Sequence, residues 1–407
     1  MAKTVIVDAE EGTRAPFLRG ILTRSLQEAG LGFDAAYALA SRVRQELASL
    51  PEVSTTDLRE RVARHLRQGG EAHALQRYQS PAAMAPQMLV RGTTGLAVPF
   101  SRSRYRRGLE NCGVAPDQAA SMTRRVAQYL VQRGGPEVSA STLGRMTYNW
   151  LRQDLGQEAA RRYLVWVDHL HSGRPLLLFV GGTAGVGKST IATELATRLE
   201  IVRTQSTDML REVMRVMLPQ RLLPTLHASS FEAWRALPLA PGPTPDRETL
   251  LAEGYRSQAD AVALSCEAVV RRALKERVSL ILEGVHVYPE LVDRATSGAD
   301  ALVVSAVVAV LKPEELRARF RGRGGRVPQR RSERYLASFE AIWGLQDYLL
   351  SEADRHGMTI VVNDDKDRAV REVLNRVIET LAAEFKGTPR QVFGHPQDDR
   401  WAKRRAG

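Results

Sequence analysis

The residues from Leu176 to Thr190 read LLLFVGGTAGVGKST, an apolar run followed by a glycine-rich loop. The loop matches the pattern G-x-x-x-x-G-K-[ST] at every defined position. In this pattern the glycines let backbone N–H groups face phosphate oxygens, the lysine reaches the β- and γ-phosphates, and the hydroxyl binds Mg²⁺. We therefore predict a nucleoside triphosphate site with Mg²⁺ on Ser189, formed by Gly182, Thr183, Ala184, Gly185, Val186, Gly187, Lys188, Ser189 and Thr190.

The two flanks of this loop have the periodicities that phosphate binding requires. The apolar run before it predicts a buried strand, and IATELATRL after it is amphipathic at helical spacing. A helix from about Lys188 to Leu199 would point its positive N-terminal end at the bound anion.

A second group of polar residues lies in STDMLREVMR, from Ser206 to Arg215. Asp208 is suited to orient or deprotonate an acceptor hydroxyl. Arg211 and Arg215 are four residues apart, so they project from one face of a helix and suit paired hydrogen bonds to a phosphate or carboxylate. The alternative interpretation is an N-capping aspartate followed by two solvated arginines.

Two polar residues follow strand-like runs. Glu283 ends the run VSLILE, and an acid there is in position to bind Mg²⁺ or its water; an ordinary loop acid is the alternative. His286 belongs to the same cleft or has a structural role. Asn363 follows TIVV and is interpreted either as a contact to the nucleotide base or as a turn residue.

The stretch LRARFRGRGGRVPQRRSERY is dense in arginine and is interrupted by glycines that break a helix. We expect a lid that closes over the triphosphate, with Arg323 and Arg326 neutralising the transferred group. An RNA-binding patch or a solvated loop is the alternative. RNA binding favours aromatic residues among the basic ones, and only Phe320 and Tyr335 occur here, so the lid is preferred. The arginines of this stretch are Arg317, Arg319, Arg321, Arg323, Arg326, Arg330, Arg331 and Arg334.

The first 170 residues contain an internal repeat with an offset of 83 residues. The motif PEVS also recurs, at Pro51 and Pro136, and both copies close on an Arg-Tyr pair. Each copy predicts a β-hairpin across a glycine turn and then about four short helices. The matched positions are Gly12, Pro16, Phe17, Arg19, Leu26 and Gly30 in the first copy and Gly95, Pro99, Phe100, Arg102, Leu109 and Gly113 in the second.

The pattern of elements predicts an α/β protein in four parts. We place the repeats at residues 3–80 and 86–170, and a P-loop kinase domain with a parallel sheet and flanking helices at residues 175–385. Its strand-like runs are LLLFV, VSLILEG, LVVSAVVAVL and MTIVVND. Residues 386–407 are polar and basic, so we predict a disordered tail there, with a cluster of cations at Lys403–Arg405.

Composition restricts the class of protein further. The chain has 407 residues, 43% hydrophobic and 26% charged, which is ordinary for a globular protein. Two distant cysteines, Cys112 and Cys266, form no disulfide or metal pattern, and no signal peptide or membrane span is predicted, so we expect a cytoplasmic protein. The net charge of +12 suits an anionic small substrate, and nucleic acid is not the favoured partner.

From about Pro99 to Asn363, the chain resembles the 2-phosphoglycerate kinase family. The resemblance rests on VPFSRSRYRRGL, EAARRYL, GGTAGVGKST, STDMLREVMR, LLPTLHASSFEAWRALP, ILEGVHVYP and RYLASFEAIWGLQDYLL. The N-terminal part of that family is similar to an ATP-cone, a small regulatory nucleotide-binding module. This chain departs from the usual layout because it carries a second cone-like copy, which offers a route to oligomers.

The resemblance implies an ATP- and Mg²⁺-dependent kinase that converts 2-phosphoglycerate to 2,3-bisphosphoglycerate. Lys188, Asp208, Arg323 and Arg326 would then act in catalysis, and Glu283 would join Ser189 on Mg²⁺. Acceptor contacts would come from Arg211, Arg215 and His227; a structural helix around His227 and Trp234 is the alternative. Another phosphorylated acceptor, such as an inositol phosphate, and a nucleotide-switched regulator or RNA-binding ATPase remain open.

Overall fold

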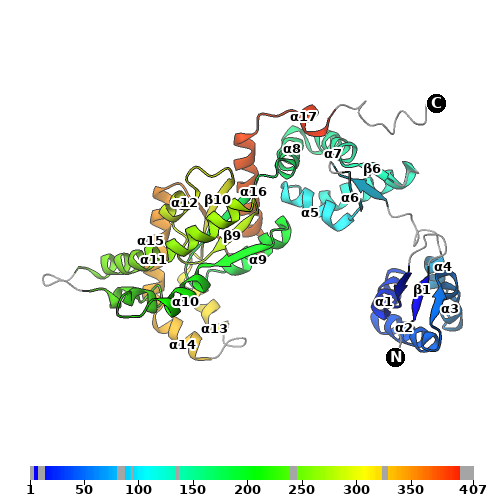
Figure 1. Ribbon diagram of the computed structural model, residues 1–407, viewed down its shortest axis with the longest axis horizontal. Helices are drawn as coiled ribbons and strands as arrows, with labels where there is room; N and C mark the ends of the chain where they lie inside the picture. The colour runs from blue at the N-terminus through cyan, green and yellow to red at the C-terminus, as the bar shows by residue number, and fades with distance from the viewer. Residues whose placement is uncertain are drawn as a thin grey trace. The chain divides into compact units, whose positions relative to one another are not determined.

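The computed structural model describes residues 4–7, 14–79, 88–92, 95–133, 137–238, 245–322 and 329–394 (Figure 1). The chain divides into two compact units. The first comprises residues 1–90, 97–100 and 130–138, and the second comprises residues 91–96, 101–129 and 139–407. In the described part of the chain, no helix is long and apolar enough to cross a membrane.

A parallel five-stranded sheet lies at the centre of the second unit, in the order β11-β10-β7-β9-β8 (Figure 1). The predicted α/β fold with a parallel sheet is confirmed. All six residues of the central strand β7 are buried, as expected for a strand covered on both faces. The strand β8 was not predicted, because RTQS is polar and forms a sheet edge. The strands are β7 (Leu176–Gly181), β8 (Arg203–Ser206), β9 (Leu280–Glu283), β10 (Leu302–Ala309) and β11 (Thr359–Val362).

Helices follow each strand and pack on the sheet. The helix α9 contacts β7, α11 contacts β9, and α15 and α16 contact β10. These contacts place helices on the sheet as the alternation of patterns predicted. The elements are α9 (Lys188–Leu199), α10 (Thr207–Met217), η2 (Pro224–His227), η3 (Ala233–Ala236), α11 (Arg247–Lys275), α12 (Pro289–Thr296), α13 (Pro313–Gly322), α14 (Gln329–Ala337), α15 (Phe339–Arg355) and α16 (Lys366–Glu384).

The two sequence copies have the same order of elements. Each has two strands, two helices, a third strand and two more helices, and in each sheet the first strand is central. The third strand was not predicted. The first copy contains β1 (Val5–Val7), β2 (Arg14–Pro16), α1 (Arg19–Glu28), α2 (Phe33–Leu47), β3 (Glu52–Ser54), α3 (Thr55–Gln68) and α4 (Ala72–Gln79). The second contains β4 (Leu89–Arg91), β5 (Ala97–Pro99), α5 (Arg102–Asn111), α6 (Pro116–Arg133), β6 (Glu137–Ser139), α7 (Ala140–Leu155) and α8 (Gln157–Ser172).

The repeated motif PEVS supplies the third strand and the cap of the next helix in both copies. The Ser54 hydroxyl accepts a hydrogen bond from the Asp57 amide at 3.0 Å, and the Ser139 hydroxyl accepts one from the Thr142 amide at 3.1 Å. An N-cap serine satisfies an amide that the helix itself leaves unpaired. The motif therefore recurs because one short segment ends a strand and begins a helix.

The repeated glycine and arginine also meet in space. Gly113 has a positive φ of 85°, and a Cβ on it would lie 2.6 Å from the Arg162 guanidinium. That guanidinium donates to the Cys112 carbonyl at 2.8 Å. In the first copy, Gly30 has a φ of 109° and lies beside Arg77. Both the positive φ and the close arginine favour glycine at position 113, whereas at position 30 the positive φ alone does, because a Cβ there would lie 3.6 Å from Arg77.

The second copy shares a hydrophobic core with the kinase domain, whereas the first has a core of its own. Leu109 and Val114 belong to the cluster that contains the residues of β7, and Leu26 belongs to a separate cluster. Three side chains of α5 also bond to the C-terminal end of α9. These bonds run from Arg104 to Glu200 at 2.6 Å, from Arg107 to the Thr197 carbonyl at 3.1 Å and from Asn111 to the Arg198 carbonyl at 2.9 Å.

Two of these three donors are absent from the corresponding positions of the first copy. The positions 83 residues before Arg104 and Asn111 are Ile21 and Glu28. Asn111 donates an amide proton to a helix carbonyl, which a glutamate carboxylate cannot do. The part of the second copy that contains α5, α7 and α8 therefore belongs to the catalytic unit.

The prediction that residues 386–407 form a disordered tail is wrong at its start. The helix α17 (Pro389–Phe393) begins with a capping box between Thr388 and Gln391. Phe393 is buried against Tyr148 and Tyr163, in a space that Gly144 leaves open. Burial of one aromatic side chain fixes a segment that is otherwise polar. The cation cluster at Lys403–Arg405 lies outside the described residues.

We expect removal of residues 1–85 to leave a folded kinase unit, and removal of residues 1–172 to destabilise it strongly. Only the second truncation removes the donors to the carbonyls at the end of α9 and opens the shared core. Thermal unfolding followed by circular dichroism, with light scattering for size, measures both. Equal melting temperatures of the two truncations would contradict the conclusion that only the second copy supports the kinase unit.

Candidate active site

The phosphate loop follows β7 and leads into α9, which begins at Lys188. Gly182, Gly185 and Gly187 have positive φ values of 134°, 88° and 95°. A Cβ on Gly182 would collide with the Val308 carbonyl oxygen. The loop therefore needs glycine for both its backbone conformation and its close approach to β10.

Side chains from two other elements bond to the loop. The Asn363 amide nitrogen donates to the Val186 carbonyl at 2.6 Å, and the Arg319 guanidinium donates to the same oxygen at 3.2 Å. Arg319 also donates to the Asn363 carbonyl and pairs with Glu315 at 2.6 Å. Asn363 was predicted to contact the nucleotide base; in the structure its side chain contacts the loop.

A cavity of about 340 Å³ adjoins the loop. It includes loop glycines, both residues that bond to the Val186 carbonyl, and the first residues after β11. This position suits a nucleoside next to the phosphate loop. The lining residues are Gly185, Gly187, Thr190, Arg319, Gly322, Asn363, Asp364 and Lys366.

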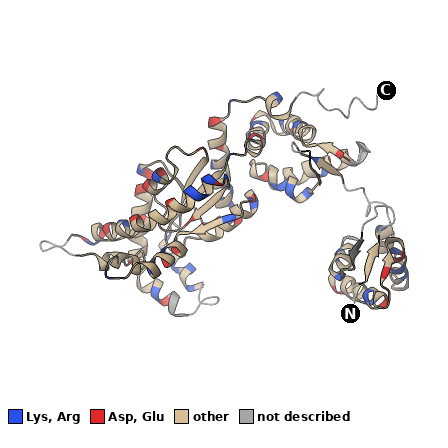
Figure 2. Ribbon diagram, viewed as in Figure 1, with Lys and Arg blue, Asp and Glu red and all other residues tan. Residues whose placement is uncertain are grey.

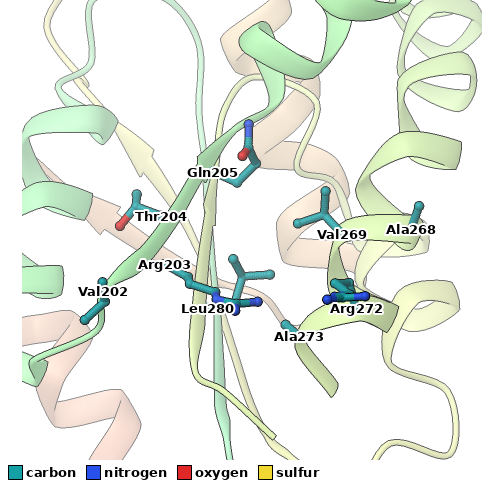
Figure 3. A pocket seen from close by; sticks show the side chains of 9 residues that line it. All are labelled: Val202, Arg203, Thr204, Gln205, Ala268, Val269, Arg272, Ala273 and Leu280. Carbon is teal, nitrogen blue, oxygen red and sulfur yellow. The ribbon is translucent and has the colours of Figure 1, made fainter. Parts of the chain in front are cut away.

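A second cavity of about 440 Å³ lies between the edge strand β8 and α11 (Figure 3). Its cations Arg203 and Arg272 are both bonded to Glu276. Its lining includes no residue of the phosphate loop. We therefore place the active site at the smaller cavity, because the chemistry of its lining suits a phosphate ligand.

Two oxygen-bearing side chains meet where the loop and β9 end. The Ser189 hydroxyl lies 3.1 Å from both carboxylate oxygens of Glu283. Glu283 is 7% exposed and pairs in register with Val180 on β7. Hydroxyl and carboxylate oxygens are the ligands that Mg²⁺ prefers. The buried Thr183 hydroxyl has no hydrogen-bond partner in the described structure, which also fits a missing polar ligand.

The helix α10 presents the predicted acceptor residues. Ser206 occupies the N-cap, so Asp208 lies within the first turn and is not the capping residue. The Asp208 side chain is 54% exposed and lies 4.0 Å from the Arg211 Nε. The arginines are less accessible, with side chains 14% and 34% exposed for Arg211 and Arg215.

Glu212 pairs with both arginines, at 3.0 Å from Arg211 and 2.9 Å from Arg215. Arg211 also donates to the Ala228 carbonyl at 2.6 Å. The Nε atoms of both arginines are buried without a hydrogen-bond partner among the described residues. Each guanidinium therefore has one N–H that these protein contacts leave unsatisfied.

His227 lies at the end of η2, and its Nε2 is 2.8 Å from the Leu218 carbonyl. This contact joins η2 to the end of α10. It supports the structural alternative, and acceptor binding by His227 remains a prediction.

His286 is fully buried, and this burial lowers the pKa of its imidazole to about 4. The carboxylate of Asp208 opposes this shift, and the positive charges of Arg211 and Lys188 add to it. The phosphate-loop lysine, α10 and the end of β9 therefore form one electrostatic environment, although they lie far apart in the sequence.

The arginine-rich stretch begins in α13 and ends in α14, and Arg323 and Arg326 lie outside the described residues. Arg317 lies over the Phe339 ring at 3.8 Å, and Arg334 donates to Ser229 at 2.8 Å. The lid role of Arg323 and Arg326 stays a prediction. Sequence reasoning did not single out Arg319, although its spacing of four residues from Glu315 indicates a fixed side chain.

The glycine loop after a central parallel strand, the adjacent carboxylate and the acceptor helix define a P-loop kinase. An AAA domain family model matches residues 177–342. The 2-phosphoglycerate kinase of Pyrococcus furiosus is 34% identical over 69% of this chain and 90% of its own length. The enzymes of Pyrococcus horikoshii and Thermococcus kodakarensis are 31% and 34% identical, over 74% and 70% of this chain and 97% and 95% of their lengths. The chain belongs to the 2-phosphoglycerate kinase family.

The buried His286 predicts a specific pH dependence of stability. Between about pH 6.5 and pH 4 the unfolded chain binds a proton at this residue and the folded protein does not. The free energy of unfolding should therefore decrease as the pH is lowered through this range, by up to about 3 kcal/mol. Denaturant titrations of the wild type and H286Q measure this difference, with the exposed His171→Gln as control. Parallel curves for the wild type and H286Q would contradict the assignment.

Proposed function

We propose that this chain transfers the γ-phosphoryl group of ATP to the 3-hydroxyl of 2-phosphoglycerate, yielding 2,3-bisphosphoglycerate and ADP. The observation that carries the proposal is the arginine pair on α10, of which Arg211 shares one electrostatic environment with Lys188. 2-Phosphoglycerate carries a phosphate and a carboxylate, the two groups that guanidinium binds in paired fashion. The relatives named 2-phosphoglycerate kinase support this choice of acceptor.

The residues have separate roles in this transfer. The backbone of the loop and Lys188 would hold the β- and γ-phosphates, and Ser189 and Glu283 would hold Mg²⁺, which supplies neutralising charge when bound. Asp208 would accept the proton of the attacking hydroxyl. The bond between the γ-phosphorus and the bridging oxygen breaks as the new bond to the acceptor oxygen forms, and ADP leaves.

The two N-terminal copies have a proposed regulatory role. Their resemblance to ATP-cones supports nucleotide binding that adjusts the activity of the kinase domain, and contact between copies of the chain through these modules. The phosphate loop and α10 belong to the second unit, so catalysis does not need the first copy.

The proposed function is tested by an acceptor screen with purified protein, ATP and Mg²⁺. We expect ADP release that depends on 2-phosphoglycerate, with a product that carries phosphate on both hydroxyls. Release that depends on inositol phosphates instead would assign another kinase, and release without any acceptor would assign a nucleotide switch.

The substitution Lys188→Ala should lower turnover by on the order of 10²–10³ or more, because a preorganised charge at the transferred phosphoryl is lost. The matched control is Lys275→Ala at the exposed end of α11, which removes the same charge. ADP production is the measurement, with circular dichroism to check the fold. A folded Lys188→Ala variant that turns over like the control would exclude the phosphate-loop assignment.

The substitutions Arg211→Ala and Arg215→Ala should raise the KM for the acceptor and leave the KM for ATP nearly unchanged. Each removes an ionic hydrogen-bond donor, which costs about 1.5–3 kcal/mol. The effect at Arg211 should be larger, since this side chain also holds the Ala228 carbonyl. The control is Arg376→Ala, on the surface of α16. A raised KM for ATP with an unchanged acceptor KM would reverse the assignment.

A further inference from the structure

A buried chain of hydrogen bonds joins the end of β9 to the acceptor helix. His286 lies three residues after Glu283, and its Nδ1 is 3.0 Å from the Thr207 hydroxyl on α10. Its Nε2 is 3.0 Å from the Gln258 side-chain oxygen on α11. The side chains of Thr207, Gln258 and His286 are all fully buried. Polar groups at this depth need partners, so each bond has a structural consequence.

The partners of Gln258 fix the direction of every bond in this chain. Its amide nitrogen donates to the carbonyls of Thr225 and Ala228, the latter at 3.0 Å, so its oxygen faces His286 as an acceptor. The His286 Nε2 must then carry the proton, and Nδ1 accepts the hydrogen of the Thr207 hydroxyl. A neutral imidazole is the form that can both donate and accept in this way.

This chain of hydrogen bonds reaches both sides of the proposed acceptor site. Thr207 immediately precedes Asp208, and the Ala228 carbonyl that accepts from Gln258 also accepts from Arg211, at 2.6 Å. The Thr207 hydroxyl also packs against the backbone at Gly284, where any Cβ would overlap it. Gly284 follows Glu283, so the hydrogen-bonded chain spans from the Mg²⁺-binding end of β9 to the residues proposed to hold the acceptor.

We propose that His286 is a positioning residue which, with Thr207 and Gln258, fixes Asp208 and Arg211 relative to Glu283. This inference rests on the proposed function of the site. The attacking hydroxyl and the metal-bound phosphoryl must meet within a narrow distance, so a rigid link between their two supports favours transfer. A buried chain in which every donor has an acceptor supplies such rigidity. His286 does not touch the reacting atoms.

The test uses Thr207→Val, which keeps the shape of the side chain and removes its donor, and Thr207→Ser, which restores the hydroxyl. In the full chain, Thr207→Val should raise the KM for 2-phosphoglycerate about tenfold and leave the KM for ATP within about twofold, since a buried acceptor on His286 loses its partner. Thr207→Ser should return the acceptor KM close to the wild-type value. The control Thr380→Val makes the same substitution at an exposed hydroxyl that bonds only within α16.

A second measurement tests how firmly α10 is held when no acceptor is present. Hydrogen exchange of the α10 amides should be faster in Thr207→Val than in Thr380→Val. Adding His286→Phe to Thr207→Val should cause little further change, since both interrupt the same chain. Equal shifts of both KM values, or equal kinetics of the valine and serine variants, would overturn the proposal. A wild type inactive on 2-phosphoglycerate would overturn the proposed function, and α10 exchange unchanged by Thr207→Val would overturn the positioning role.

Discussion

The site depends on the shape of the phosphate loop, and that shape depends on the carbonyl oxygen of Val186. Asn363 and Arg319 both donate to this oxygen, from the segment after β11 and from α13. The glycines of the loop have positive φ values, and their backbone has no side chains to hold it in place. Two donors on one buried carbonyl fix the loop before a ligand arrives, and preorganised amides are what stabilise a developing phosphoryl charge.

The helix that follows the phosphate loop, α9, accounts for a difference between the two repeats. A helix that presents its N-terminus to an anion must have its C-terminal carbonyls satisfied elsewhere. The second copy supplies donors to that end of α9 through Arg107 and Asn111. The first copy has the same order of elements and an independent core. The two copies therefore differ in their packing, because residues of the second join the core of the catalytic unit and the first has a core of its own.

Arginine is abundant in this protein, but many of its arginines are paired. Figure 2 shows basic and acidic residues interspersed along the helices of both units. Pairs such as Arg317–Glu340 and Arg198–Glu194 use their charge locally, and exposed pairs of this kind contribute little stability. The arginines of α10 are both paired with Glu212, and each also has a buried Nε without a hydrogen-bond partner in the described structure, as Arg174 has. Arg211 and Lys188 both act on the pKa of His286, and this proximity, rather than the net charge, supports the proposed anionic acceptor.

The sequence by itself determined the phosphate loop, the parallel sheet and the repeat, because glycine spacing, apolar runs and repeated motifs are local signals. It also singled out Asp208, Arg211 and Glu283 as polar residues at the ends of predicted elements. Only the tertiary structure decided that Thr207, His286 and Gln258 bond to one another, that Asn363 contacts the loop and that Phe393 anchors the C-terminal helix. The edge strand β8 was missed because RTQS lacks the apolar pattern of a buried strand. Contacts between residues far apart in the chain depend on how helices pack on the sheet, and no local pattern records that packing.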